Sequence, residues 1–338
     1  EQKPTFSYLA GQYLTLRFFI DGQEARRAYS MSSSPLEQGP AVSIKRVKGG
    51  LVSNHVADNV QVGIQVEVMP PQGKFTVSPN PEKRYDYYLF GAGSGITPLM
   101  SIIKTLLEEE PKSSIYLLYG NRDENSIIFQ DQLNQLSEKY AGQLVVEHTL
   151  SRPKRKKTGT LASWFTGGKV VWTGRTGRIG DSMVQEFLDK FPNDAPDARY
   201  FICGPGDMID IVEASLQSRG IDSQQIFTER FVSANDVKGK SNGHHNGKAK
   251  IIAKVNGQEV SVELKPGQSI LDGLLEAKAN PPYSCLAGAC STCAAKVIKG
   301  GVKMEVCYAL DDDEVADGMI LTCQSHPTTE EVIVDYNL

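Results

Sequence analysis

The chain has 338 residues, of which 40% are apolar and 22% are charged, values typical of globular proteins with two or three domains. Its formal net charge of −4 lacks the basic footprint of a nucleic-acid binder, and no run approaches the ~18 consecutive apolar residues of a membrane span. Nothing at the start resembles a signal segment, so the sequence predicts a cytoplasmic protein without nucleic-acid or membrane partners.

The first part of the chain, residues 1–84, is expected to form an antiparallel β-barrel. Short β-rich runs such as Tyr13–Ile20 and Val42–Val47 are separated by glycine, proline and serine. The chain begins with Glu1 rather than Met and opens directly into this pattern. We therefore expect the first strand of the barrel to be missing.

Residues 85–232 are expected to form an α/β domain with a parallel sheet, because strand and helix patterns alternate there. Predicted strands cover Tyr85–Phe90, Ile115–Tyr119 and Arg199–Cys203. One face of the helix after the first of these strands is apolar, at Leu99, Ile102, Ile103, Leu106 and Leu107.

Residues 233–249 are polar and glycine-rich without periodicity, which predicts a flexible linker, and His244 and His245 are expected to be solvated there. Residues 250–338 then begin a small α+β domain. The Asn256–Gly257 pair between two β-rich runs predicts a hairpin. The run Asp311–Glu314 is interpreted either as a solvated loop or as part of an acidic face that docks a partner.

Six cysteines, four of which cluster late in the chain, indicate a metal or redox site rather than a disulfide scaffold. Cys285, Cys290, Cys293 and Cys323 have the C-x4-C-x2-C…C spacing of a plant-type [2Fe–2S] cluster. A zinc site or free buried cysteines are the alternatives, but zinc sites usually show paired short spacings and only one C-x2-C occurs here. Cys307 lies outside the pattern and is expected to be structural. Over residues 250–338 the sequence resembles plant-type ferredoxins with a β-grasp-like fold.

A hydride donor gives two electrons at once and such a cluster accepts one, so a flavin is expected to stand between them. The run Arg27-Ala28-Tyr29-Ser30 resembles the Arg-x-Tyr-Ser motif of the ferredoxin–NADP reductase family. The resemblance implies that Arg27 pairs with the flavin pyrophosphate, Tyr29 packs on the isoalloxazine ring and Ser30 hydrogen-bonds near its N5. An arginine and a tyrosine on an ordinary barrel strand are the alternative.

Two further segments of the first domain are implied to bind FAD by the same resemblance. Gly50, Leu51, Val52 and Ser53 match a glycine turn and a hydroxyl at a helix N-terminus, where backbone amides attract phosphate. A plain capping turn is the alternative. The preceding residues Ile44, Lys45 and Arg46 are also expected to contact the cofactor.

The second domain carries the nicotinamide-dinucleotide signals of that family. Its glycine loop, with Gly93, Ser94, Gly95 and Thr97, joins a strand to a helix, and tight strand–helix packing is the alternative. Cys203, Gly204 and Pro205 match the Cys-Gly-Pro element that lies beside the nicotinamide ring, where Cys203 helps to position the hydride without acting as a nucleophile; a buried structural thiol is the alternative. Glu229 and Phe231 match an acidic and an aromatic residue near the flavin, or a plain strand end.

The order of flavin barrel, nucleotide domain and ferredoxin domain resembles the reductases of multicomponent oxygenases, particularly that of phenylacetyl-CoA epoxidase. The resemblance implies electron flow from NAD(P)H through FAD to the [2Fe–2S] cluster and on to an oxygenase partner. Reductases of Rieske-type oxygenases, an FMN-binding relative, a regulatory protein that keeps only the fold and an oxygen-reducing flavin oxidase are the alternatives. Arg122 and Arg152 resemble a 2′-phosphate clamp and favour NADPH, whereas Asp123 and Glu124 favour NADH.

Overall fold

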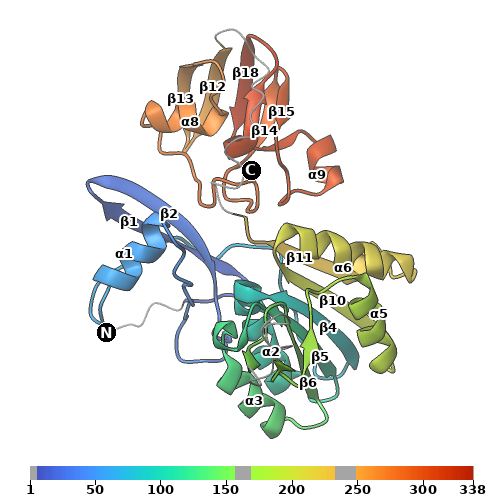
Figure 1. Cartoon of the computed structure of the whole chain (residues 1–338). Coiled ribbons are helices and arrows are strands. Elements are labelled where there is room, and N and C mark those ends of the chain that lie inside the picture. Colours follow the sequence, from blue (N-terminus) through green and yellow to red (C-terminus); the bar gives the residue numbers. More distant parts are fainter. Residues whose placement is uncertain (1–5, 157–168, 233–248, 338) are drawn as a thin grey trace. The chain divides into compact units, whose positions relative to one another are not determined.

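A computed structural model describes residues 6–156, 169–232 and 249–337 of the chain (Figure 1). Among these residues no helix is both long enough and apolar enough to cross a membrane. The predicted linker at 233–249 lies, apart from Ala249, outside the described residues. Contacts divide the chain into two compact units. The first unit comprises Glu1–Tyr13, Tyr29–Lys45 and Lys74–Phe231, and the second comprises Leu14–Ala28, Arg46–Gly73 and Val232–Leu338.

The first unit contains a six-stranded parallel sheet in the order β11-β10-β4-β5-β6-β9, as the sequence predicts for an α/β domain. Its strands are β4 Tyr85–Ala92, β5 Ser114–Asn121, β6 Leu144–Leu150, β9 Arg175–Thr176, β10 Asp197–Gly204 and β11 Ile226–Arg230. Its helices are η1 Gly93–Gly95, α2 Ile96–Glu109, η2 Glu124–Ser126, α3 Gln130–Lys139, α5 Asp181–Lys190, α6 Gly206–Ser218 and η3 Ser223–Gln225. A separate pair joins β7 Arg155–Lys156 to β8 Lys169–Val170.

Helices cover both faces of this sheet (Figure 1). Along β4, Tyr87 and Leu89 belong to the core that contains the apolar face of α2, whereas Tyr88 and Phe90 belong to the core of α5 and α6. A strand covered on both faces is mostly apolar, which explains the run Tyr87–Phe90 of β4, whereas the buried Asp86 accepts hydrogen bonds from the Asp194 and Ala195 amides. The predicted apolar face of α2 is confirmed, since all five of its residues are buried.

A buried carboxylate anchors the segment that leads into β4. Glu110 is fully buried and accepts hydrogen bonds from the Asn80 amide (2.7 Å), the Tyr87 hydroxyl (3.0 Å) and the Ser113 hydroxyl (2.8 Å). A buried charge is tolerated when its lone pairs are satisfied in this way.

The second unit contains a five-stranded mixed sheet in the order β13-β12-β18-β14-β16. Its strands are β12 Ala249–Val255, β13 Gln258–Leu264, β14 Ala294–Lys299, β16 Met319–Leu321 and β18 Glu331–Asp335, and β15 Val302–Met304 pairs with β17 Ser325–Pro327. Helix α8, Ile270–Glu276, follows a reciprocal capping box between Ser269 and Asp272. The predicted Asn256–Gly257 hairpin is confirmed by the antiparallel pairing of β12 with β13.

The antiparallel sheet of the N-terminal part has the order β2-β1-β3, with β1 Tyr13–Ile20, β2 Gln23–Ser30 and β3 Glu67–Val68. Strands β1 and β2 each pass from one contact unit into the other. The predicted strand over Val42–Val47 is wrong, because only an isolated bridge between Met31 and Val42 forms there. The neighbouring Ala41 carbonyl instead accepts a hydrogen bond from the Ser32 amide (2.8 Å).

The acidic run Asp311–Glu314 is not a loop, because it begins the short helix α9, Asp312–Ala316. A separate 3₁₀ turn, η4, covers Thr322–Gln324. Asp311 caps the helix by accepting from the Glu314 amide (2.8 Å), and Glu314 accepts from the Asp311 amide (3.0 Å). Two of the four carboxylates thus serve the helix terminus. An acidic docking face that includes all four carboxylates of Asp311–Glu314 stays a prediction.

Candidate functional site

The sheet of the first unit changes winding direction between β4 and β10, and ligands of such sheets bind outside the carboxyl ends of the strands at this point. Cys203 on β10 is in register with Gly91 on β4, so the Cys-Gly-Pro segment and the glycine loop leave the sheet side by side. A Cβ on Gly95 would lie 2.0 Å from the Cys203 carbonyl oxygen. The packing alternative therefore accounts for Gly95.

The rest of the glycine loop is fixed by hydrogen bonds to its carbonyls. The Tyr119 hydroxyl donates to the Gly93 carbonyl (2.8 Å), and the Thr97 hydroxyl donates to the Ser94 carbonyl (2.9 Å). Gly93 has a φ of 55°, and a Cβ there would lie 3.7 Å from the Lys45 ammonium. A left-handed glycine beside a lysine and a helix N-terminus fits an anionic ligand.

Three residues that the sequence places 26 to 199 positions apart meet at one carboxylate. The Ser30 hydroxyl donates to Glu229 Oε2 (3.0 Å), and the Cys203 thiol lies 3.9 Å from the same oxygen. Cys203 is fully buried, and this burial together with the Glu229 carboxylate raises the pKa of the thiol well above its ordinary value. A thiol that stays protonated fits a positioning role and argues against a nucleophile.

The remaining predicted residues of this carboxyl edge lie close by along the chain. Pro205 is the N-cap residue of α6, and the Phe231 amide donates to the Gly204 carbonyl (3.3 Å). Beyond β5 and β6, the Arg152 amide donates to the Arg122 carbonyl (2.7 Å), which brings the two candidate clamp residues together. Arg122 also pairs with Asp123 (3.0 Å).

In the second unit the predicted phosphate turn lies at the start of α1, Leu51–Asn59, whose N-cap residue is Gly50. A Cβ on Gly50 would lie 2.6 Å from the Ser53 hydroxyl oxygen, which accepts from the Val47 amide (3.1 Å). The Ser53 hydroxyl therefore serves the turn that precedes α1 and does not cap the helix. No side chain of the described residues caps α1, so its first amides can take an anion.

The other predicted flavin residues show mixed surroundings. Arg27 on β2 is half-buried and donates to the Arg26 carbonyl (2.6 Å). Arg46 is engaged by Asp58 (2.9 Å) and Asn54 (2.7 Å) on α1, so a phosphate would have to compete with these partners. Ile44 is half-buried, Ala28 and Tyr29 are half-buried on β2, and Val52 is buried in α1.

The four predicted ligand cysteines lie in contact with one another. The Cys285 thiol interacts with Cys290 and with Cys323, and Cys323 also interacts with Cys293. Contact with Cys285 and burial raise the pKa of Cys290 well above its ordinary value, so a bound metal must supply the charge that keeps these sulfurs as thiolates. Cys307 is set apart, with its thiol 3.9 Å from the Leu310 carbonyl oxygen.

This arrangement fits a two-iron cluster. Within residues 6–156, 169–232 and 249–337, no three histidine, cysteine or acidic side chains converge on the position of a single ion. A cluster with two irons and four thiolates does not require such convergence. Backbone and side-chain groups support the loop: the Ala287 amide donates to Cys285 Sγ (3.4 Å), and Gln324 Nε2 donates to the Leu286 carbonyl (3.2 Å).

Gly288 makes the curled loop possible, because its φ is 68° and a Cβ there would lie 2.9 Å from the Val306 carbonyl oxygen. We expect Gly288→Ala to lower the bound iron to about half or less and to destabilise the fold by about 1–3 kcal/mol. Iron analysis and thermal unfolding measure both effects. Gly257→Ala is the matched control, since its φ is 76° but the space around it is open. Equal iron loss in both variants would contradict this role of Gly288.

Sequence reasoning missed a polar cluster that holds the cysteine loop within the second unit. Arg26 is buried and pairs with Glu24 (2.6 Å), and its guanidinium lies 4.4 Å from the centre of the Tyr283 ring. The Tyr283 hydroxyl donates to Glu24 (3.1 Å), and Thr15 donates to Ser284 (2.9 Å). Charged residues that alternate along β2 read as an exposed strand face, so only their distant partners reveal this function.

Three family models match the chain in succession: "Oxidoreductase FAD-binding domain" at residues 1–77, "Oxidoreductase NAD-binding domain" at 89–214 and "2Fe-2S iron-sulfur cluster binding domain" at 253–328. The chain is 36% identical to a component of the 1,2-phenylacetyl-CoA epoxidase of Escherichia coli (strain K12), over 98% of this chain and 89% of that protein. It is 32% identical to the 3-ketosteroid-9-alpha-monooxygenase ferredoxin reductase component of Rhodococcus rhodochrous, over 99% and 90% of the two chains.

Among solved structures, phthalate dioxygenase reductase, described as a modular structure for electron transfer from pyridine nucleotides to [2Fe-2S], shares the fold. The TM-score is 0.57 at 23% identity, over 97% of this chain and 88% of that one. The three matched domains follow the order that the sequence predicts.

Proposed function

Because this chain belongs to the ferredoxin–NADP reductase family, in the group with a C-terminal [2Fe–2S] domain, we propose that it carries electrons from NADPH to a phenylacetyl-CoA epoxidase oxygenase. The chain is an NAD(P)H-dependent flavin and iron–sulfur oxidoreductase that uses FAD and a [2Fe–2S] cluster. The observation that carries the choice of acceptor is the 36% identity to the epoxidase component over 98% of the chain.

Bound FAD would accept a hydride and release its electrons singly to the cluster. In the second unit, Arg27 and the first amides of α1 would hold the flavin phosphates. In the first unit, Tyr29 would cover the flavin ring. Ser30, whose hydroxyl donates to Glu229, would border the flavin ring, and the neutral Cys203 would border the nicotinamide. Cys285, Cys290, Cys293 and Cys323 hold the cluster.

A coupled assay tests the choice of acceptor. The purified reductase is combined with the oxygenase components of a phenylacetyl-CoA epoxidase or with a Rieske-type oxygenase, and NADPH consumption and oxygenated product are measured. We expect product formation in step with NADPH consumption for the epoxidase. Faster coupled turnover with the Rieske oxygenase would favour a Rieske-type oxygenase as the acceptor, as for other reductases in this family. The six cysteines, all of which lie among the described residues, form no disulfide there, which supports a cytoplasmic location.

The donor preference rests on Arg122 and Arg152, whose backbones meet beyond β5 and β6. We expect kcat/KM for NADPH to exceed that for NADH, and Arg152→Ala to lower the NADPH value by about tenfold with little change for NADH, because a guanidinium binds a phosphate through charge-assisted hydrogen bonds. Arg84→Ala is the control, since Arg84 precedes the opposite, amino end of β4 and pairs with Asp194 (2.6 Å). A wild-type kcat/KM for NADH equal to or above that for NADPH would remove the clamp hypothesis.

A further inference from the structure

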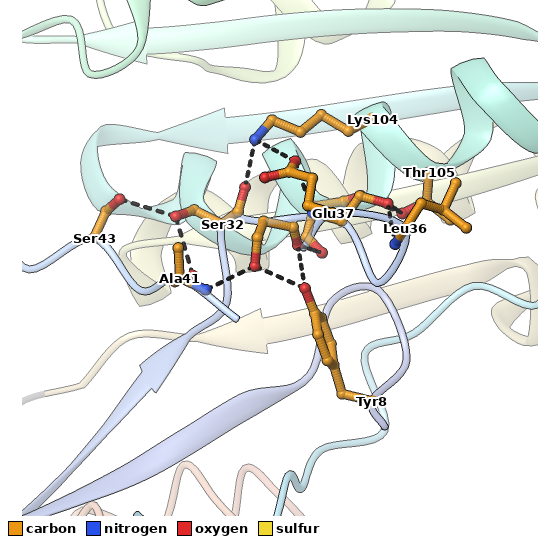
Figure 2. A network of polar contacts seen from close by, with 11 residues as sticks. Tyr8, Ser32, Leu36, Glu37, Ala41, Ser43, Lys104 and Thr105 are labelled. Atoms are coloured by element: carbon orange, nitrogen blue, oxygen red, sulfur yellow. Dashed lines mark hydrogen bonds and ion pairs between the residues drawn. The ribbon is translucent and has the colours of Figure 1, made fainter. Parts of the chain in front are cut away.

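A run of three serines, Ser32–Ser34, begins two residues after the end of β2. In the first unit this serine run is bound to one face of helix α2 (Figure 2). The Ser101 hydroxyl donates to the Ser33 carbonyl (2.6 Å), and the Lys104 ammonium donates to the Ser32 carbonyl (3.1 Å). The hydroxyls of Thr105 and Ser34 share a further hydrogen bond (2.8 Å). Residues 101, 104 and 105 are spaced as i, i+3 and i+4, so a single helix face makes all three contacts.

A second set of contacts holds the same run from its other side (Figure 2). The Ser33 hydroxyl lies 2.7 Å from the Tyr8 hydroxyl and accepts from the Ala41 amide (2.8 Å). Glu37 accepts from the Ser34 amide (3.1 Å) and pairs with Lys104 (2.9 Å). Both the backbone and the side chains of the run are therefore fixed.

Burial makes most of this network rigid. Ser33, Ser101 and Thr105 are at most 3% exposed. A buried donor or acceptor that loses its partner costs about 1–3 kcal/mol, so these contacts stay closed in the native state. The Lys104–Glu37 ion pair is more exposed, so water and salt weaken its charge attraction. Both residues also make hydrogen bonds to the serine run, which hold them in place.

The two ends of this network lead to the two reactants. Helix α2 begins directly after the glycine loop Gly93–Gly95, whereas the serine run begins two residues after Ser30. Ser101 lies six residues beyond Gly95, about 9 Å along the helix. The helix is buried along most of its length, so it transmits the position of its first turn to the serine run.

We propose that Ser101 and Lys104 are positioning residues that set the approach of the nicotinamide to the flavin. The proposal rests on the placement of the flavin at Ser30 in the proposed site. Hydride transfer depends steeply on the separation and alignment of donor and acceptor, and a misplacement of about 1 Å costs about 100-fold in rate. A connection from the dinucleotide loop to the Ser30 strand through two helical turns controls that separation without touching either reactant.

Rapid anaerobic mixing of the FAD-loaded reductase with NADPH, without any oxygenase, tests this proposal. For the double variant Ser101→Ala/Lys104→Met we expect the limiting rate of flavin reduction to fall about tenfold, while flavin content and the Kd for NADP⁺ stay within about twofold. The amplitude of the long-wavelength absorbance formed between bound NADP⁺ and reduced flavin is expected to fall as well. The single variant Lys104→Arg keeps the charge and the hydrogen-bond donors, so we expect it to keep most of the wild-type rate of flavin reduction.

The matched control is Lys139→Met. Lys139 lies on α3 and pairs with Glu108 (3.2 Å), which lies near the C-terminal end of α2. It is expected to keep the wild-type limiting rate. A double variant that melts at a lower temperature but reduces its flavin at the wild-type rate would overturn the proposal, and so would an equal loss in Lys139→Met. Should the double variant fail to fold, the half-exposed Lys104→Met alone gives the same reading. Because no oxygenase is present, a wrong choice of acceptor cannot produce either result.

Discussion

Cys290→Ala is expected to lose the cluster while keeping the flavin reaction. Bound iron should fall from about two atoms per chain to near zero, since two thiolates hold each iron and a missing thiolate leaves one iron without full ligation. Electron delivery to the oxygenase should fall about 100-fold or more, because the flavin then lacks its one-electron acceptor. Reduction of the flavin by NADPH should stay within about twofold of wild type, because Cys290 lies outside the first unit, which contains Ser30, the glycine loop and Cys203.

Cys307→Ala is the matched control for this prediction. Cys307 is half-buried, whereas Cys290 is buried, and it lies in the same apolar cluster as Cys293 and Cys323, yet its thiol faces the Leu310 carbonyl. We expect this variant to keep its iron and its electron delivery. Iron analysis, visible absorbance and oxygenase turnover distinguish the two variants. Loss of iron in Cys307→Ala together with full iron in Cys290→Ala would refute the ligand assignment.

The second large effect is expected at Ser30 and Glu229. Ser30→Ala and Glu229→Ala should each slow flavin reduction at saturating NADPH by about 10- to 100-fold, because each removes one partner of the hydrogen bond that orients the Ser30 hydroxyl. The double variant should be no slower than the slower single variant, since two residues that act through one hydrogen bond give non-additive effects. Flavin content should not change.

Thr228→Ala serves as the control for that cycle, because Thr228 neighbours Glu229 on β11 but is exposed. Stopped-flow measurement of flavin reduction in the wild type, the two single variants and the double variant gives the coupling free energy between Ser30 and Glu229. Additive losses in the double variant would show that the two residues act independently.

Cys203→Ala should retain flavin and slow its reduction by no more than about tenfold, because a buried neutral thiol shapes the site without forming a bond.

Much of the fold could be predicted because local signals agree with the tertiary structure. The apolar run Tyr87–Phe90 of β4 is typical of a strand covered on both faces, the Asn256–Gly257 pair of a tight turn, and the cysteine spacing of a curled loop. Each of these features is written into neighbouring residues. The strand expected over Val42–Val47 failed because the polar groups beside it bind the serine run instead of a neighbouring strand.

The candidate site was less accessible to sequence reasoning, because its contacts join distant segments. Glu229 was selected only by resemblance, whereas its bond to Ser30 spans 199 residues. Ser101 and Lys104 look like polar positions of an amphipathic helix, and nothing local indicates that both bind a serine run about 70 residues earlier. The capping pair of α9 carries a sequence signal, but an acidic run reads equally well as a solvated loop.

The measurement that tests the central claim most directly is reduction of the cluster by NADPH in chains with and without flavin. Anaerobic protein is mixed with NADPH, frozen at successive times and examined by electron paramagnetic resonance for the reduced [2Fe–2S] signal. In the flavin-loaded protein we expect the signal to appear no faster than the flavin bleaches. In flavin-free protein with full iron, NADPH should leave the cluster oxidised although dithionite reduces it, because the hydride then has no two-electron acceptor. Equally fast reduction by NADPH in the flavin-free protein would contradict electron flow through the flavin.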